Sequence, residues 1–472
     1  MTPDELAYFS LDELGRAYLT GGLSPVEVTE AMLARIERLN PRINAFLKIT
    51  ADEARKQARS AETEIRAGEW RGPLHGVPVS VKDLFFTRGV ETTGGSPIYR
   101  NFVPDFDSTV VARLKAAGAV LLGKTHLHEL AYGITNDNPH YGPCLNPWDR
   151  TRIPGGSSGG SAAAVSAGLS FASFGTDTGG SIRIPASYCG VTGLKPTYGR
   201  ISRYGVIPLS VNLDHVGPFA RTVKDAAVAA EIVAGSDKND PSSLRAACPS
   251  WAENLESSIR GWRIGAVRGA FIGALHPEIA QAMANAEFEL ERAGAALEEI
   301  EIPDATEIGE IAHLLQMADG AAVYHRRIIE QPEAFSEDVR ILIEQGHLVS
   351  AVDYINAQRF RRQFQKKLRA LFRRLKAMIL PATPIPAPLL GQREIELAGA
   401  PEDVGIASTR LVRPFNFAGV PVLTVPCGIT NTGLPFGMQI VTRAADELTG
   451  LSLGHVYQER TQWHTRRPTD CY

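Results

Sequence analysis

One lysine and two segments rich in glycine and serine carry the side chains of this sequence that are best suited to covalent chemistry. Lys82 ends the apolar segment Gly76–Lys82. The segment Pro154–Ser161 leads directly into a run of helix-forming residues, and the segment Gly175–Ala186 places Ser181 after Thr-Gly-Gly. A serine hydroxyl becomes a nucleophile only when a base takes its proton. Two such serines and a lysine therefore indicate nucleophilic catalysis.

Three interpretations compete for the segment Pro154–Ser161. A phosphate-binding loop requires a lysine after its second glycine, and this segment has none. A nucleophile elbow, G-x-S-x-G, matches Gly156–Gly160 with Ser158 as the nucleophile, but the polar, proline-ended stretch 150–154 does not predict the preceding strand. A flexible Gly/Ser linker would not run straight into the helix expected at 162–168, so we expect an ordered loop ahead of that helix.

The segment Gly175–Ala186 has the features of an oxyanion site. A strand candidate, Phe171–Phe174, runs into it. Successive backbone N–H groups in such a glycine-rich turn can form an anion-binding nest, and donors aimed at a developing oxyanion stabilise the transition state. A plain glycine-rich turn is the alternative.

Lys82 is the candidate base. Residues 76–82 alternate with the period of a strand, with the valines on one face and Pro78, Ser80 and Lys82 on the other. Burial would lower the pKa of the lysine and make it a base near neutral pH, whereas a strand-end lysine that points into water would be inert. Histidine is the usual base, but none lies near either serine in sequence; the nearest are His126, His128, His140 and His215.

Several segments together resemble the amidase signature family over nearly the whole chain. They are 76–83, 123–125, 146–148, 155–161, 175–183 and 190–197, with Asn416, Gly419, Pro421, Pro426 and 433–435 near the C-terminus. The spacings of 75 residues from Lys82 to Ser157 and 24 from Ser157 to Ser181 also suit that family. The resemblance implies one large α/β/α domain over residues 1–472, with a mixed central sheet surrounded by helices.

The resemblance assigns roles residue by residue. Ser181 matches the nucleophile, Lys82 matches the base, and Ser157 matches the serine in an unusual cis conformation that bridges the two. Ser158 and Arg183 fall at supporting positions, which leaves the elbow interpretation as the minor alternative. The family's oxyanion hole corresponds to the backbone N–H groups of Thr178, Gly179, Gly180 and Ser181.

The implied activity is hydrolysis of the C–N bond of a linear, non-peptide amide through an acyl-enzyme, with no metal or organic cofactor. One subgroup of the family, the catalytic subunit of the glutamyl-tRNA(Gln)/aspartyl-tRNA(Asn) amidotransferase, holds glutamine with an acidic residue before an Asn-x-x-Gly segment. Here Thr409 takes that position, which favours a stand-alone amidase. Arg340 is a candidate for holding a carboxylate. Two alternatives remain, the catalytic subunit of a tRNA-dependent amidotransferase or a carbamate- or biuret-type amidohydrolase, whereas the intact triad argues against a non-catalytic homologue.

Composition narrows the class of protein. The 472 residues carry a net charge of −3, which gives no global reason to bind nucleic acid or an anionic membrane. No apolar run approaches a membrane span, and the acidic, amphipathic N-terminus lacks the features of a signal peptide. The five scattered cysteines argue against a disulfide framework or a zinc site and favour a cytoplasmic location. A small amide is the expected partner, and a homodimer is one option for assembly.

The surrounding elements alternate between helix and strand. Residues 1–70 are expected to be helical, with capping boxes at Ser24 and Thr50, and residues 73–220 to hold the catalytic motifs. Within that core, a helix at 108–118 precedes a strand at 119–122. A long basic amphipathic helix is expected over 353–380, most simply as a solvated face, and strands near 421–426 and 437–441.

Overall fold

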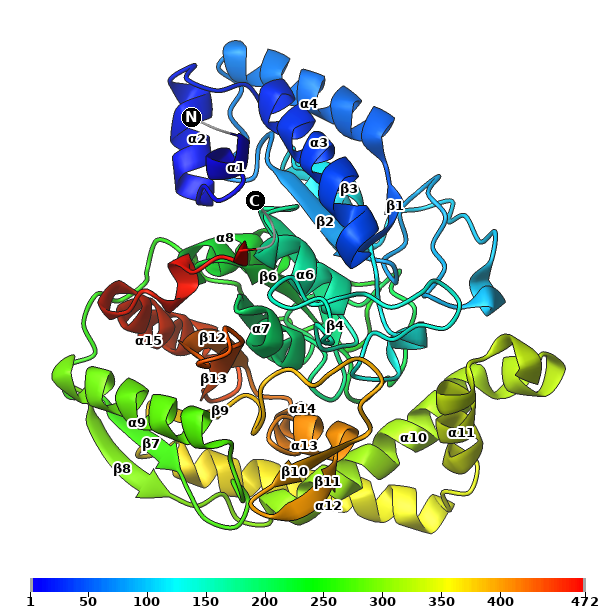
Figure 1. Ribbon diagram of the computed structural model, residues 1–472, viewed down its shortest axis with the longest axis vertical. Helices are drawn as coiled ribbons and strands as arrows, with labels where there is room; N and C mark the ends of the chain where they lie inside the picture. The colour runs from blue at the N-terminus through cyan, green and yellow to red at the C-terminus, as the bar shows by residue number, and fades with distance from the viewer. Residues whose placement is uncertain (1–2, 470–472) are drawn as a thin grey trace.

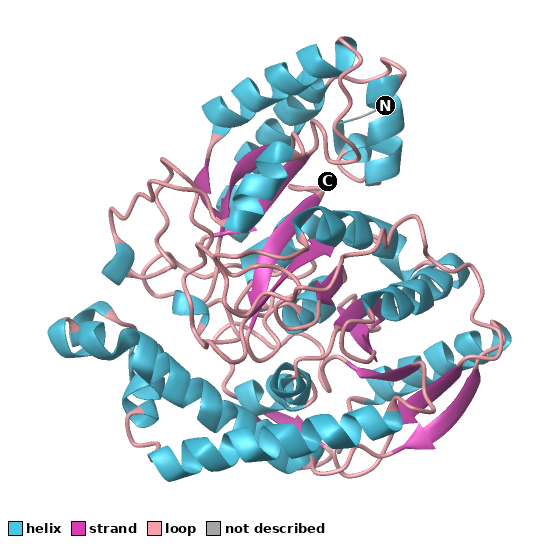
Figure 2. Ribbon diagram, turned by 180° about the vertical axis from the view of Figure 1, so that it is seen from behind, coloured by secondary structure: helices cyan, strands magenta, loops and turns pink. Residues whose placement is uncertain are grey.

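A computed structural model describes residues 3–469 and has one 11-stranded mixed sheet at its centre, with helices packed against both faces (Figures 1 and 2). The strand order is β1-β3-β2-β4-β6-β5-β12-β13-β9-β7-β8. Strands β3, β2 and β4 are mutually parallel, as are β9, β7 and β8, and the strands between these groups are antiparallel. This architecture confirms the predicted α/β/α fold with a mixed sheet.

The strands of the sheet are β1 (Phe46–Ile49), β2 (Pro78–Lys82), β3 (Val120–Thr125), β4 (Ala172–Asp177), β5 (Thr192–Lys195), β6 (His215–Ala220), β7 (Arg263–Val267), β8 (Ala296–Ile300), β9 (Ala377–Pro381), β12 (Val422–Ile429) and β13 (Pro435–Val441), and a separate hairpin pairs β10 (Glu394–Leu397) with β11 (Ala400–Asp403). The α-helices are α1 (Pro3–Leu6), α2 (Leu11–Leu19), α3 (Pro25–Ile43), α4 (Ala51–Arg66), α5 (Thr109–Ala116), α6 (Gly159–Ser166), α7 (Arg183–Cys189), α8 (Val223–Val233), α9 (Pro277–Arg292), α10 (Ala305–Glu330), α11 (Glu337–Gly346), α12 (Ala351–Leu371), α13 (Val404–Arg410), α14 (Arg413–Ala418) and α15 (Glu447–Arg460).

The N-terminal part is mostly helical, as expected, but it also contributes a strand. The predicted capping box at Ser24 is present on α3. The one expected at Thr50 is absent, because the Thr50 hydroxyl donates to the carbonyl of Leu121 on β3 instead. That bond lies beside the pairing of β1 with β3, so tertiary contacts decide the local structure here.

The basic helix is shorter than the range 353–380 predicted for it. Helix α12 ends at Leu371, and residues 377–381 form β9, a buried strand in the middle of the sheet's C-terminal half. Phe364 and Leu368 of the predicted apolar stripe are buried, but Phe360 is 48% exposed. The apolar run that seemed to continue the helix belongs to the strand.

The parallel strands β3, β2 and β4 bring three motifs to one edge of the sheet. Parallel strands present their carboxyl ends together, and Lys82 pairs in register with Thr125. Asp177 ends the neighbouring strand β4. Every residue of β2 is buried, so Lys82 lies inside the fold and not at a strand end that faces water.

Candidate active site

Lys82 contacts three hydroxyl groups. Its Nζ lies 2.8 Å from Ser157 Oγ, 3.0 Å from Ser158 Oγ and 2.8 Å from Thr176 Oγ1. The side chain is fully buried, and this burial lowers the pKa of Lys82 well below its ordinary value, although the charges of Asp214 and Asp177 oppose the shift. The amine therefore contacts three hydroxyl groups, and none of its hydrogen-bond partners among the described residues is a carboxylate.

Two other buried lysines are bonded differently. Lys124 pairs with Asp83 at 2.8 Å and donates to Thr92 Oγ1 at 2.7 Å, and Lys195 donates to the carbonyl oxygens of Pro196 and Val420 at 3.1 and 2.5 Å. A carboxylate or a carbonyl oxygen can only accept. Of these three lysines, Lys82 is therefore the one whose hydrogen-bond partners are all hydroxyl groups, which can donate as well as accept.

The adjacent serines Ser157 and Ser158 have different surroundings. Ser158 Oγ donates to the carbonyl of Thr176 at 2.9 Å and accepts from the N–H of Thr176 at 3.2 Å, so its hydrogen is already committed. Ser157 Oγ has Lys82 as its hydrogen-bond partner, and the Gly156–Ser157 peptide bond is cis, as the resemblance implies. This accounting leaves the proton of Ser157 free to be donated to Lys82 and gives Ser158 a supporting place.

Ser181 lies beside this pair at the mouth of a small cavity. Its carbonyl accepts from the N–H of Ser158 at 3.2 Å, which ties the two glycine-rich segments together. Its hydroxyl makes no hydrogen bond with any of residues 3–469. The residue is 5% exposed and lines a cavity of about 60 Å³. A reactive hydroxyl at this position could be reached by a small substrate group.

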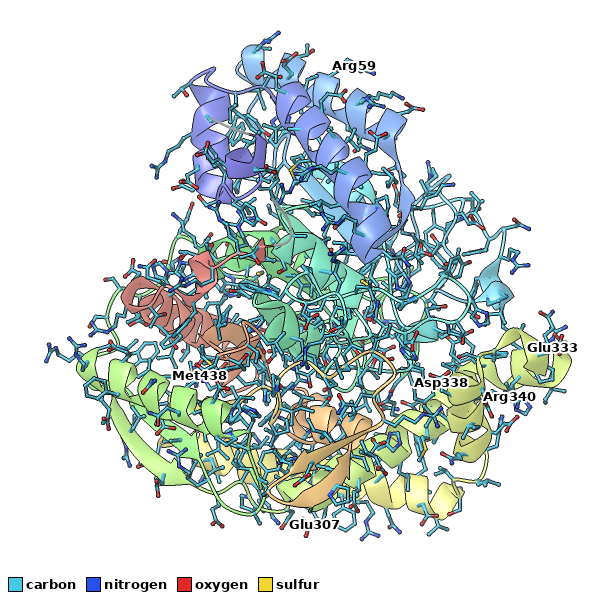
Figure 3. The ribbon with its side chains drawn as sticks, viewed as in Figure 1. Arg59, Glu307, Glu333, Asp338, Arg340 and Met438 are labelled. Carbon is cyan, nitrogen blue, oxygen red and sulfur yellow. The ribbon has the colours of Figure 1, made fainter. Side chains whose placement is uncertain are left out.

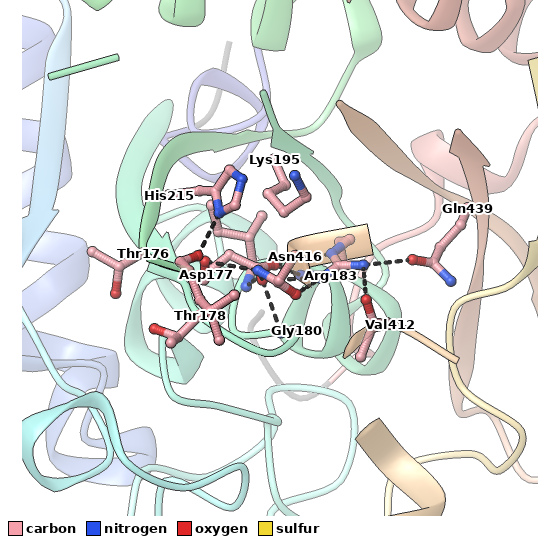
Figure 4. A network of polar contacts seen from close by, with 12 residues as sticks. Thr176, Asp177, Thr178, Gly180, Arg183, Lys195, His215, Val412, Asn416 and Gln439 are labelled. Carbon is pink, nitrogen blue, oxygen red and sulfur yellow. Dashed lines mark hydrogen bonds and ion pairs between the residues drawn. The ribbon is translucent and has the colours of Figure 1, made fainter. Parts of the chain in front are cut away.

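Asp177 holds the loop that carries Ser181. Its carboxylate accepts from the N–H groups of Gly180 and Ile182 at 2.8 and 3.0 Å and from Arg183 Nη2 at 3.0 Å (Figure 4). Burial alone would raise the pKa of Asp177, but the charge and hydrogen bonds of Arg183 hold it well below its ordinary value. The carboxylate therefore stays ionised and holds the turn through its bonds to the backbone and to the Arg183 side chain.

Arg183 and Asn416 extend this network to the C-terminal half of the chain. Arg183 Nη1 donates to the carbonyl of Val412 at 2.7 Å and to Gln439 Oε1 at 2.9 Å, and Asn416 Nδ2 donates to Asp177 Oδ1 at 2.7 Å (Figure 4). Each of these buried charges and amides has partners, as buried polar groups require. The network therefore joins motifs that lie more than 200 residues apart in the sequence.

The four N–H groups expected to form an oxyanion hole are not equivalent. The N–H of Gly180 is taken by Asp177, whereas those of Thr178, Gly179 and Ser181 make no hydrogen bond within the described part of the chain. A backbone N–H carries one hydrogen, so Gly180 has none left for a ligand. The hydroxyl of Thr178 donates to Asp214 Oδ1 at 2.6 Å, which steadies the start of the turn.

The wall of the cavity at Ser181 combines residues of segments singled out in the sequence, Tyr132 and Thr409, with residues of α10 that no motif indicated. Tyr132 lies in a loop after β3, His313 and Gln316 come from α10, and Arg413 begins α14. Thr409, the residue at the position of the acid in the amidotransferases, also lines this cavity, and its hydroxyl donates to the carbonyl of Gly405 at 2.6 Å. No local pattern groups these wall residues, because they come from several separate elements.

Arg340 and the four histidines named from the sequence are not brought to the serine hydroxyls. Arg340 lies on α11 toward the edge of the molecule, with Glu344 at 3.6 Å, and does not line the cavity (Figure 3). His126, His128 and His215 contact Gly142, Asp338 and the Leu213 carbonyl, and His140 lies near Glu129. These histidines therefore supply no base to either serine.

Three comparisons with known proteins bear on this site. The amidase family profile matches residues 27–451. The chain belongs to the amidase family. It is 40% identical over 487 residues to a glutamyl-tRNA(Gln) amidotransferase subunit from Roseiflexus sp. (strain RS-1), with 98% of each protein covered.

Solved structures of the family have the same fold. One, described as a vestigial protein complex that reveals the evolutionary origins of an s-triazine catabolic enzyme, is 39% identical with a TM-score of 0.92 and covers 96% of this chain and 98% of its own. A crystal structure of an amidase is 36% identical with a TM-score of 0.87 and covers 96% of this chain and 100% of its own. The protein is thus an amidase-family enzyme, a hydrolase that acts on amides.

None of the helices within residues 3–469 is long and apolar enough to cross a bilayer. Cys144, Cys189, Cys248 and Cys427 are free thiols, and Cys471 lies outside the described residues.

Proposed function

We propose that this protein hydrolyses a small carboxylic acid amide by a Ser181 acyl-enzyme mechanism, with Ser157 and Lys82 as the proton relay. The observation that carries the proposal is the 2.8 Å contact between a buried Lys82 amine and Ser157, whose hydroxyl has no competing acceptor. A lysine in place of histidine is a known variant of serine hydrolase chemistry.

The reaction has two halves. Neutral Lys82 accepts the proton of Ser157, which accepts that of Ser181, and Ser181 Oγ attacks the amide carbonyl. The N–H groups of Thr178, Gly179 and Ser181 stabilise the oxyanion, while Gly180 and Asp177 hold their turn in shape. The proton returns through Ser157 to the leaving amine as the C–N bond breaks, and water then cleaves the ester. No cofactor takes part in these steps.

The catalytic subunit of a tRNA-dependent amidotransferase is the second candidate, because the 40% identity to one component of such an enzyme favours it. That role requires the ammonium group of glutamine to be held near Ser181. The cavity lining contains no carboxylate, and Thr409 supplies only a hydroxyl already bonded to its own helix. We therefore place a stand-alone amidase of the cytoplasm first.

The test is hydrolysis of a panel of amides by the isolated chain, with Ser181→Ala as the comparison. We expect turnover of one or more small amides, labelling by a serine-reactive fluorophosphonate, and loss of both in Ser181→Ala by at least about 10⁴-fold in rate. Near-normal turnover in Ser181→Ala would refute the nucleophile. Glutamine hydrolysis that appears only with the other amidotransferase subunits present would favour the second candidate.

A further inference from the structure

Three residues that line the cavity at Ser181 each have a buried polar atom without a hydrogen-bond partner in the range 3–469. These atoms are the hydroxyl of Tyr132, Nδ1 of His313 and Nε of Arg413. Buried polar atoms in folded proteins nearly always have a hydrogen-bond partner, so three in one wall indicate a group they are built to bind. Tyr132 is only 2% exposed, so its hydroxyl does not lie at the surface in contact with bulk water.

Arg413 makes this wall cationic. It forms no hydrogen bond or ion pair with any of residues 3–469, whereas buried Arg183 has Asp177 and buried Arg200 has Glu447 at 3.3 Å. Burial lowers the pKa of Arg413 only to about 10, so the guanidinium keeps its charge at neutral pH. No acidic residue of the described part of the chain lines this small cavity, although the charge of Asp403 acts on Arg413 from nearby, and Glu310 and Glu402 line the larger cavity that Arg413 also borders.

Arg413 also lies directly against the oxyanion turn. A Cβ placed on Gly179 would lie 3.1 Å from Gln316 Oε1 and 3.7 Å from Arg413 Nε. Burial and the nearby charge of Arg413 lower the pKa of His313 to about 4, so this histidine stays neutral and adds no second charge. Among the described residues, Arg413 is therefore the one charged side chain that lines this small cavity, and it lies against the turn that carries Ser181.

The cavity limits what can bind beside the nucleophile. Its volume of about 60 Å³ holds roughly four or five waters, so only a few non-hydrogen atoms fit. A cavity of about 480 Å³ shares the wall formed by His313 and Arg413 and could take a larger remainder of the substrate. A planar carboxylate matches the fork of a guanidinium and can also accept from a tyrosine hydroxyl.

Resting on the function proposed above, we propose that the substrate carries a carboxylate within a few bonds of the scissile amide carbonyl, and that Arg413, with Tyr132 and His313, binds it. The enzyme would then act on half-amides of short dicarboxylic acids and related anionic amides. Neutral amides of the same shape leave the Arg413 charge unpaired and are rejected.

The test compares succinamate with levulinamide, a neutral amide of the same size in which a methyl ketone replaces the carboxylate. We expect kcat/KM to be about 100-fold higher for succinamate, as for a desolvated charge pair. Arg413→Met should remove most of that preference. Arg340→Met, which deletes an arginine outside the cavity, should preserve it.

Binding separates this inference from the proposed mechanism. In the Ser181→Ala protein, calorimetry should show succinamate binding about 100-fold more tightly than levulinamide, and Arg413→Met in that background should abolish the difference. Equal affinity for the two amides, or a preference that persists in Arg413→Met, would overturn the carboxylate site whether or not the protein turns over any amide. A preference in binding without turnover would retain the site and refute the hydrolytic mechanism.

Discussion

The two sides of Ser181 differ in how their polar groups are bonded. On the side of β2, β4 and α7, the carboxylate of Asp177 and the guanidinium of Arg183 have several partners each. On the side of α10 and α14, Tyr132, His313 and Arg413 each keep a buried atom unbonded. The Asp177–Arg183 network is bonded without a ligand, whereas we propose that a ligand supplies the partners of the wall atoms.

This difference places the groups proposed to carry out the reaction on one side of Ser181 and the groups proposed to select the substrate on the other. A saturated network holds its members in one geometry and is costly to disturb, because each buried group depends on the others. An unsaturated wall costs stability in the free protein and returns that free energy when a matching group binds. Substitutions on the saturated side should therefore affect every substrate, whereas those in the wall should affect substrates unequally.

The largest effect is expected from Lys82→Met. Loss of the base should lower kcat/KM by about 10⁴-fold or more for every amide, since the relay then has no acceptor. Lys195→Met removes an equally buried amine whose partners are carbonyl oxygens, so it should reduce stability while its folded fraction retains most activity. A Lys82→Met enzyme within tenfold of the original rate would remove lysine from the mechanism.

Asp177→Asn should come next, through stability. It leaves Arg183 as a buried charge without an anionic partner, which costs about 3–5 kcal/mol of unfolding free energy in urea titrations. Asp12→Asn breaks an exposed ion pair with Arg16 at 2.5 Å and should cost only about 0.5 kcal/mol. Equal costs for the two variants would mean that the Asp177 network adds nothing special to the fold.

The pH dependence of hydrolysis should show the lowered pKa of Lys82. Only the neutral amine accepts a proton, so kcat/KM should fall about tenfold per pH unit below that pKa, and the fall should begin well below pH 10.5. His313, with a pKa of about 4, is neutral above pH 5, so His313→Gln should not move the acid limb. A rate that is flat down to pH 5 would contradict a lysine base.

The lowered pKa of Lys82 also makes the unfolding free energy depend on pH. The unfolded chain binds a proton at Lys82 below pH 10.5, whereas the folded protein resists it, so the unfolding free energy should fall as the pH is lowered from 10.5 toward the folded pKa. Lys82→Met should flatten this slope in urea titrations at a series of pH values. An unchanged slope would mean that the lysine is charged in the folded protein.

The contrast between the two sides of Ser181 also explains which parts of the site the sequence could predict. The strands that end at Lys82 and before Ser181, and the helix after Ser158, follow from local patterns and adjacent motifs. Tyr132, His313 and Arg413 lie far apart along the chain and become neighbours only through packing, so no spacing rule finds them. The same reason explains the error at 372–380, where an apolar run fits a helix equally well until its pairing with β13 makes it a strand.

The smallest effect is expected from Tyr132→Phe, and it tests the wall directly. Removing an unbonded buried hydroxyl should change the unfolding free energy by less than about 0.5 kcal/mol, because no hydrogen bond is lost. Tyr324→Phe is the matched control: its hydroxyl donates to the carbonyl of Pro208 at 2.8 Å, and its loss should cost about 1 kcal/mol. With saturating succinamate and a Ser181→Ala background, the order should reverse, since Tyr132→Phe then loses a bond to the ligand while Tyr324→Phe loses none. A Tyr132→Phe variant that is as destabilised as Tyr324→Phe without ligand would show that this hydroxyl is bonded within the fold, and the contrast between the two sides of Ser181 would not hold.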